Sequence, residues 1–327
     1  MHYRAAVLVL GCLAGLSANA VNAGDIVLTL PLDCTLGQNC FVQNYMDRDE
    51  GPGAADFTCG PLSYDNHRGT DFAIPSLSAM KRGVNVQASA PGIVRSVRDN
   101  VPDIASNAPN APDIRGRECG NGVLIEHGGG WETQYCHMKK GSVAVKPGQR
   151  VTSRTALGQV GLSGDTQFPH VHLSVRKDGE EIDPFNPESF VSCGKLPMHS
   201  LWEKDLPYIP GAIINMGFMT HVPSYADVLA GPAPVTTLAK DSPAIVLWMH
   251  AFGGEAGDMI EFRISGPDGV LTSYRSTLSK GQARYFRATG KRLTGSRWGK
   301  GTYTGIVRIL RDGREISRRS ATIIISE

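Results

Sequence analysis

The chain has no apolar run long enough to cross a membrane as a helix, which takes about 20 residues. Its most continuous apolar stretch, residues 5–16, follows Arg4 and leads into small residues that end at Ala20 and Ala23. A positive residue, a short apolar run and small residues at Ala-x-Ala spacing are typical of a secretory signal peptide. We therefore predict a signal peptide over residues 1–23, no transmembrane segment, and export to the periplasm or the extracellular space. A lipid-anchored Cys12 is the weaker alternative, because the apolar run before it is brief.

Three chemical signatures are also missing. No Cys-x-x-Cys pair occurs, which argues against a zinc–thiolate site. No His-Glu-x-x-His occurs, so the glutamate base of helical zinc proteases is absent. The basic and aromatic residues form no recognisable nucleic-acid-binding motif, and we expect no nucleic-acid partner.

The central part of the chain lacks a helical repeat with caps. Short alternating segments separated by glycine predict strands instead, and an antiparallel all-β domain. The expected strands cover residues 84–88, 92–97, 123–127, 132–137, 158–160 and 171–176. The glycines at 128–130 predict a hairpin turn, and on its second strand alternation places Tyr135 and His137 on one face and Cys136 on the other.

Two histidines lie one residue apart within one of these strands. Because side chains alternate along a strand, His170 and His172 face the same way, while Val171 and Leu173 face a core. Upstream, His67 and Asp71 are separated by a short segment with a glycine that allows a tight turn. A catalytic zinc site takes three protein ligands and leaves a fourth position for water. His67, Asp71 and one histidine of the later pair would complete such a set.

These motifs and their surroundings resemble the lysostaphin-type (LytM-like) zinc metallopeptidases, which cut peptide cross-links in bacterial cell walls. The resemblance covers roughly residues 61–187. It is carried by segments 67–75 (HRGTDFAIP), 90–94 (APGIV), 120–128 (GNGVLIEHG), 133–138 (TQYCHM), 146–151 (KPGQRV), 157–161 (LGQVG) and 170–172 (HVH). Gln167 and Phe168 stand where the family usually has small residues, and Val171 and Leu173 replace bulkier ones, which affects the expected shape of the substrate groove.

The resemblance implies a role for each motif residue. His67, Asp71 and His172 match the ligands of one Zn²⁺ ion, and His137 and His170 match the two histidines beside the metal-bound water. Since no position of this set is missing, the resemblance implies an active enzyme. Histidines titrate near neutral pH, so His137 and His170 are suited to take a proton and to steady an oxyanion; which does which stays open.

Six cysteines remain after the leader, and an even number in an exported chain predicts three disulfides. Only the even count is firm, and many pairings are possible. Cys34 with Cys40 would close a small loop, Cys119 with Cys136 would join the central hairpin, and Cys59 with Cys193 would tie together the two ends of the expected catalytic domain.

The domain organisation follows from these segments. We expect a signal peptide (1–23), a disulfide-held arm (24–60), the LytM-like domain (61–193), a linker (194–233) and a second domain (234–327). The last part contains expected strands over 244–250, 259–265, 270–276, 284–288, 301–311 and 316–326, with Asp-Gly hairpin signals at 268–269 and 312–313. Such closely spaced short strands predict an immunoglobulin-like β-sandwich. The loop over 99–118 is either a rim of the substrate groove or a disordered insertion.

Charge is unevenly divided between the two parts. Residues 234–327 contain 15 Lys and Arg against 8 Asp and Glu, a net of +7, whereas the remainder has 18 against 23, a net of −5. A basic domain favours binding to an anionic envelope polymer, although a merely solvated surface explains the charge equally well. For His127, His199, His221 and His250 we expect structural roles, because none lies at ligand spacing from another candidate.

The leading hypothesis is an exported zinc metalloendopeptidase that hydrolyses peptide bonds of peptidoglycan, in cross-bridges or stem peptides. One alternative is a catalytically silent wall-binding or regulatory protein of the same fold. Another is a secreted protease for glycine-rich proteins.

Overall fold

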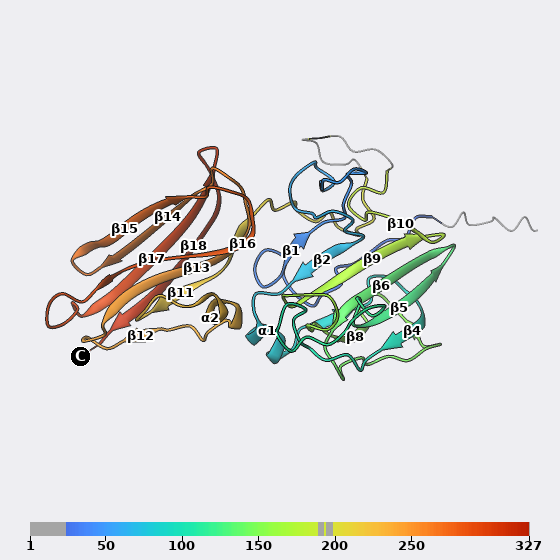
Figure 1. The fold of residues 1–327 in the computed structure, drawn as a ribbon, viewed down its shortest axis with the longest axis horizontal. Coiled ribbons are helices and arrows are strands. Elements are labelled where there is room, and N and C mark those ends of the chain that lie inside the picture. The colour runs from blue at the N-terminus through green and yellow to red at the C-terminus, as the bar shows by residue number, and fades with distance from the viewer. Residues whose placement is uncertain (1–23, 189–192, 194–198, 327) are drawn as a thin grey trace, which may run out of the picture.

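The computed structural model describes residues 24–188, 193 and 199–326 (Figure 1). The predicted signal peptide lies outside the described residues. The described chain is mostly β, with an N-terminal sheet on one side and two C-terminal sheets on the other. No helix among these residues is long and apolar enough to cross a membrane.

The N-terminal sheet is antiparallel and has β9 near its middle. Its strands are, in spatial order, β1 (Phe41–Asn44), β2 (Thr70–Ala73), β9 (His170–Lys177), β6 (Trp131–Met138), β5 (Asn121–Gly128), β4 (Gly92–Arg98) and β7 (Arg150–Val151), and β10 (Glu180–Glu181) pairs with β9. A small second sheet contains β3 (Asn85–Gln87) and β8 (Ala156–Gln159), and helix α1 spans Leu77–Arg82. The predicted antiparallel β architecture of this part is confirmed.

One face of this sheet packs into a hydrophobic core. Val171, Leu173 and Val175 of β9 are buried there together with Tyr135 of β6, as the alternation predicts. The other face of β9 carries His170 and His172. The strand alternation therefore separates the core from the polar site, which gives the histidines a rigid support.

Three disulfides join the six cysteines among the described residues. Cys34 pairs with Cys40, Cys59 with Cys193 and Cys119 with Cys136, so the suggested pairings are confirmed. The N-terminal segment is packed as well as cross-linked, because Leu28, Leu32 and Tyr45 belong to the core of the N-terminal part.

The C-terminal part consists of two sheets that share a hydrophobic core. One sheet has β11 (Ala212–Met219), β13 (Ala244–Gly254) and β16 (Gln282–Arg292), and the other has β12 (Thr237–Leu238), β18 (Arg314–Ile325), β17 (Gly301–Arg311), β14 (Met259–Gly266) and β15 (Gly269–Thr277). The Asp-Gly signals both form hairpin turns, with positive φ at Asp312, Gly313 and Gly269. Strand β11 and helix α2 (Tyr225–Ala230) lie within the stretch expected to be a linker, and β11 pairs with β13.

Strand β13 is buried on both faces over its whole length. Its residues Leu247, Met249 and Ala251 point into the C-terminal core. On the opposite face, Phe252 belongs to the core of the N-terminal part and stacks on Phe41, with ring centroids 4.6 Å apart. The two parts therefore share an apolar interface, and their closest helices, α1 and α2, are in contact as well.

Candidate metal centre and active site

Three potential metal ligands converge at the β2–β9 pair. Asp71 lies directly opposite His172 in the register, and His67 precedes β2 in the adjoining loop. The ligand atoms of His67, Asp71 and His172 lie within 4.8 Å of one another. His67 Nε2 is 3.1 Å and His172 Nδ1 is 2.9 Å from Asp71 Oδ1. Two imidazoles and one carboxylate form a donor set that Zn²⁺ commonly takes, with room for a fourth ligand.

The second nitrogen of each ligand histidine is also occupied. His67 Nδ1 lies 2.7 Å from the Tyr45 carbonyl, so Nδ1–H donates and Nε2 is left to face the site. His172 Nε2 lies 3.1 Å from Ser174 Oγ, and Ser174 donates in turn to the Arg68 carbonyl. Such partners fix the tautomer and the ring orientation of a metal ligand. Both the residue type and the orientation of the two histidines are therefore suited to binding a metal ion.

The glycine between the two upstream ligands has a steric reason. A Cβ on Gly69 would lie 2.5 Å from His172 Nε2 and 2.6 Å from the Leu173 carbonyl oxygen. Because real Cβ atoms do not approach other atoms so closely, a larger residue would push β9 away from β2. The glycine is thus needed for close packing against the ligand histidine.

Asp71 is almost fully buried and is held by Asn44 of β1. Asn44 Nδ2 donates to Asp71 Oδ2 at 2.9 Å, which leaves Oδ1 for the histidines. Burial raises the pKa of Asp71, but the nearby imidazoles of His67 and His170 outweigh it and hold this pKa well below its ordinary value. Sequence analysis missed Asn44, because only the β1–β2 pairing brings it beside Asp71.

His170 and His137 lie beside this cluster with their rings 4.7 Å apart. His170 Nδ1 lies 2.8 Å from the Phe168 carbonyl, and its Nε2 is 3.3 Å from Asp71 Oδ1. His137 Nδ1 lies 2.8 Å from the Ser163 carbonyl. In both residues Nδ1–H donates to the backbone, which leaves Nε2 unprotonated when the ring is neutral. All five predicted site residues are thus brought together.

The route by which His137 reaches the site differs from the prediction. Cys136 pairs with His172 and so shares its face, whereas Tyr135 pairs with Leu173 on the core face. Regular alternation would turn His137 into the core. A bulge opposite Gly122 and a positive φ of 62° at His137 redirect the side chain toward His170. The expectation that His137 and Tyr135 share one face was therefore wrong.

Burial, together with the neighbouring His170 and His172, lowers the pKa of His137 to about 3. His137 is consequently a neutral imidazole at neutral pH, in a form that can accept a proton.

The other four histidines among the residues that the structure describes lie outside the metal-ligand group. His127 contacts the Pro91 carbonyl and Thr133 Oγ1 between β5 and its neighbours. His199 lies 3.6 Å from Asp25, and His221 is exposed. His250 is fully buried between the two parts of the chain.

The long loop before β5 is fixed next to the site. Asp103 accepts a hydrogen bond from the Leu162 backbone at 2.8 Å, and the Ser106 backbone donates to the Thr166 carbonyl at 2.8 Å. The loop thus lies against the segment that leads to His170. Its predicted role as a groove rim stays a prediction.

Comparison with known proteins points to one family. The model of peptidase family M23 matches residues 65–184. The peptidoglycan DD-endopeptidase ShyA of Vibrio cholerae is 32% identical over 117 residues, which are 36% of this chain and 22% of that protein. The DD-carboxypeptidase/endopeptidase Mpg of Neisseria meningitidis is 30% identical over 120 residues, again 36% of this chain and 22% of that protein. The chain thus matches about a fifth of the length of these relatives.

Among solved structures, the catalytic domain of the M23 protein EnpA from Enterococcus faecalis is similar. It is 22% identical, and the match covers 49% of this chain and 94% of that one with a TM-score of 0.32.

Proposed function

Because the model of peptidase family M23 matches residues 65–184, we propose that the protein is an exported zinc endopeptidase that hydrolyses a peptide bond of bacterial peptidoglycan. The bond lies in a cross-bridge or a stem peptide. The observation that supports this most is the convergence of His67, Asp71 and His172 with two further histidines beside them. The similarity to ShyA, a peptidoglycan DD-endopeptidase, and to Mpg, a DD-carboxypeptidase/endopeptidase, favours the same class of substrate.

His67, Asp71 and His172 would hold one Zn²⁺ ion, which supplies a water of lowered pKa and polarises the scissile carbonyl. Asn44 and Ser174 keep two of these ligands in orientation. Other residues of the chain then transfer protons and stabilise the negative charge that develops during the reaction.

One of His170 and His137 accepts a proton at Nε2, and the other stabilises the oxyanion, for which its ring must carry a proton at Nε2 as well as at Nδ1. Each presents Nε2 while a backbone carbonyl holds Nδ1–H. A neutral imidazole takes a proton at Nε2, and the resulting imidazolium can donate it to the leaving amine. The low pKa of His137 keeps this residue in its accepting form at neutral pH.

The decisive experiment is digestion of purified peptidoglycan by the zinc-loaded mature protein, with His172→Ala as the control. New peptide termini produced only by the unmutated protein, read by mass spectrometry, would identify the bond. If walls of several cross-link types release nothing although zinc is bound, the protein is a silent wall-binding protein or a protease for glycine-rich proteins.

We propose export to the periplasm or the extracellular space. Three disulfides support this location, because such bonds persist in oxidising compartments. Protease protection in intact and osmotically shocked cells would test it, and a protein found with cytoplasmic markers would contradict it.

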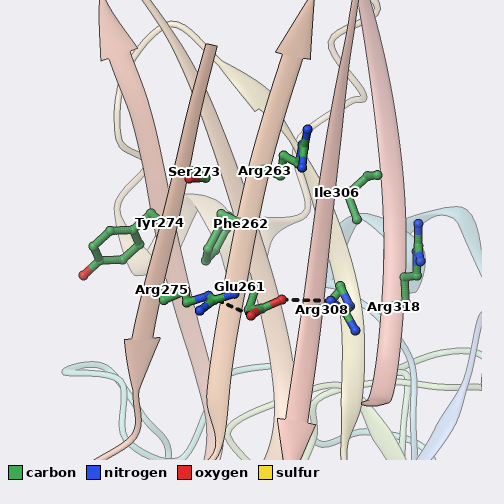
Figure 2. A pocket seen from close by; sticks show the side chains of 9 residues that line it. All are labelled: Glu261, Phe262, Arg263, Ser273, Tyr274, Arg275, Ile306, Arg308 and Arg318. Atoms are coloured by element: carbon green, nitrogen blue, oxygen red, sulfur yellow. Dashed lines mark hydrogen bonds and ion pairs between the residues drawn. The ribbon is translucent and has the colours of Figure 1, made fainter. Parts of the chain in front are cut away.

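We also propose that the C-terminal part is an immunoglobulin-like sandwich that binds phosphate groups of an anionic envelope polymer. A row of charged residues crosses its outer sheet, because Arg275, Glu261, Arg308 and Arg318 are register partners on four neighbouring strands. These residues and Arg263 line a hollow of about 760 Å³. Figure 2 shows their side chains on the neighbouring strands.

Charge supports an anionic ligand for this hollow. Glu261 contacts Arg275 at 2.8 Å and Arg308 at 3.0 Å, and Glu315 also contacts Arg308. The four arginines outnumber these two glutamates, and Arg263 and Arg318 are exposed. Guanidinium groups match phosphate geometry well.

Cosedimentation with cell walls, before and after removal of their phosphate polymers with hydrofluoric acid, tests this surface. Changing Arg263 and Arg318 together to Gln should weaken binding to untreated walls about tenfold, since two charge-assisted contacts are lost. The same change at the exposed residues Lys280 and Arg297 is the matched control. Equal binding by both double variants, or unchanged binding to stripped walls, would refute the proposal.

A further inference from the structure

Phe168 lies two residues before His170, and its ring contacts residues of the C-terminal part. The side chain is 3% exposed and is covered by the C-terminal part. The Arg284 guanidinium carbon lies 4.0 Å from the centre of the Phe168 ring. The His250 ring contacts Phe168 edge-on, with centroids 6.0 Å apart. The large residue thus has a specific partner surface in this chain.

That surface is one face of the sheet formed by β11, β13 and β16. His250 and Phe252 lie on the same face of β13, opposite the residues that enter the C-terminal core. Arg284 of β16 is the register partner of Phe252, which stacks on Phe41 of β1. Arg284 is therefore fixed by the same apolar contact that joins the two parts.

Phe168 is connected to the active site through its backbone. Its carbonyl oxygen accepts hydrogen bonds from His170 Nδ1 at 2.8 Å and from Thr166 Oγ1 at 2.9 Å. Pro169, with its restricted φ, is the only residue between Phe168 and His170. A displacement of the Phe168 ring would therefore move the carbonyl that holds the His170 imidazole.

An arginine at position 284 carries an unfavourable desolvation free energy at this interface. Nη1 of Arg284 is buried and has no hydrogen-bond partner among the described residues. Burying a cation without an anionic partner costs free energy, and a leucine would fill the same space without that cost. The stacking on Phe168 offsets this cost, because a cation over the face of an aromatic ring is attracted to the ring.

We propose that Arg284 is a positioning residue for the reaction: by stacking on Phe168 it fixes the carbonyl that sets the tautomer and orientation of His170. This inference rests on the proposed peptidase function. It makes the C-terminal part a component of the catalytic unit. A residue more than a hundred positions beyond His170 in the sequence thus acts on the site through one aromatic ring.

The test uses the zinc-loaded mature chain and a soluble cross-linked peptidoglycan fragment as substrate. Arg284→Leu and Phe168→Leu should each lower kcat about tenfold while KM stays within about twofold, because a misplacement well below 1 Å at a reacting group already slows a reaction. The double variant should resemble either single variant, since both remove one contact. Phe168→Tyr keeps the ring and should retain kcat.

Arg287→Leu is the matched control. Arg287 lies on the same strand and also stacks on an aromatic ring, that of Tyr285, at 5.6 Å, but it does not reach Phe168. We expect unchanged kcat for this variant. Zinc content and thermal midpoint are measured for every variant, so that loss of metal or of folding is not mistaken for mispositioning.

A second measurement, of the His170 tautomer, does not depend on cleavage of a substrate. Nitrogen NMR of imidazole-labelled protein should show the Nδ1–H tautomer for His170 in the parent and a mixture of tautomers in Arg284→Leu. Equal kcat in Arg284→Leu and Arg287→Leu, or an unchanged His170 tautomer, would overturn the inference. If the parent cleaves no peptidoglycan but the tautomer still responds to Arg284, the proposed function fails and the positioning role stands.

Discussion

Acid sensitivity of the interface between the two parts is the prediction that the structure defines most sharply. His250 is 0% exposed, and neither of its ring nitrogens has a hydrogen-bond partner among the described residues. It faces Phe168, Tyr225 of α2 and the positive charge of Arg284 on β16. Burial, together with the positive charge of Arg284, lowers the pKa of His250 to about 3.

The sign of the pH effect follows from this shift. In the unfolded chain the His250 pKa returns to its ordinary value of 6.5, so the unfolded state binds the proton more readily. Stability from the neutral, buried ring is therefore fully present above pH 6.5 and is lost as the pH falls toward 3. Between pH 8 and pH 5, linkage gives a loss of about 2 kcal/mol.

The assay is thermal unfolding of the zinc-loaded mature chain at pH 8 and at pH 5. The parent and His250→Leu are compared, because other buried histidines contribute equally to both. The variant should lose less stability on acidification, and the difference should be roughly 4 °C in Tm. His221→Leu, which removes an exposed histidine, is the control and should behave like the parent.

The reasoning would be refuted if His250→Leu and the parent lost the same Tm between the two pH values. Such a result would mean that His250 is hydrated or partnered in solution and does not feel the burial on which the argument depends.

Three further predictions concern the metal site and the Cys119–Cys136 disulfide. His172→Ala should lose both zinc and activity, whereas His137→Ala should keep zinc and lose turnover by about 10²-fold to 10⁴-fold; metal analysis with a cleavage assay checks both, and full activity in either would contradict the assignment. Asn44→Ala should weaken zinc binding about 10-fold to 100-fold, because Asp71 loses the donor that orients it; competition with a chelator measures this, and parent-like affinity would exclude the role. Replacing Cys119 and Cys136 by Ser opens a bond that spans 17 residues and should reduce the unfolding free energy by about 3 kcal/mol in denaturant titration; an unchanged value under oxidising conditions would show that this bond does not constrain the chain.

Strands and ligands could be predicted from the sequence because both depend on local patterns. Alternation placed Val171 and Leu173 in the core and His170 and His172 on the other face, and the register confirms this. Asp-Gly turns located the C-terminal hairpins because such a turn needs positive φ over a short span.

Features that depend on pairing between distant segments could not be predicted in this way. The bulge that turns His137 into the site breaks the alternation on which the prediction relied. The sequence of strand β11 shows no clear alternation of apolar and polar residues. The strand is stabilised by pairing with β13, which is buried on both faces. The sequence around Asn44 does not indicate its role, because only the pairing of β1 with β2 brings this residue beside Asp71.

The residues that complete this site come from outside the segment matched by the family model. Asn44 holds Asp71, and the Tyr45 carbonyl holds His67, although both precede residue 65. On the other side, Arg284 covers Phe168 from a strand well beyond residue 184. The matched segment supplies the ligands, whereas the arm and the C-terminal sheet restrict how those ligands and His170 can move. Because orientation of pre-placed groups contributes much of an enzyme's rate, the flanking segments are expected to influence turnover as well as stability.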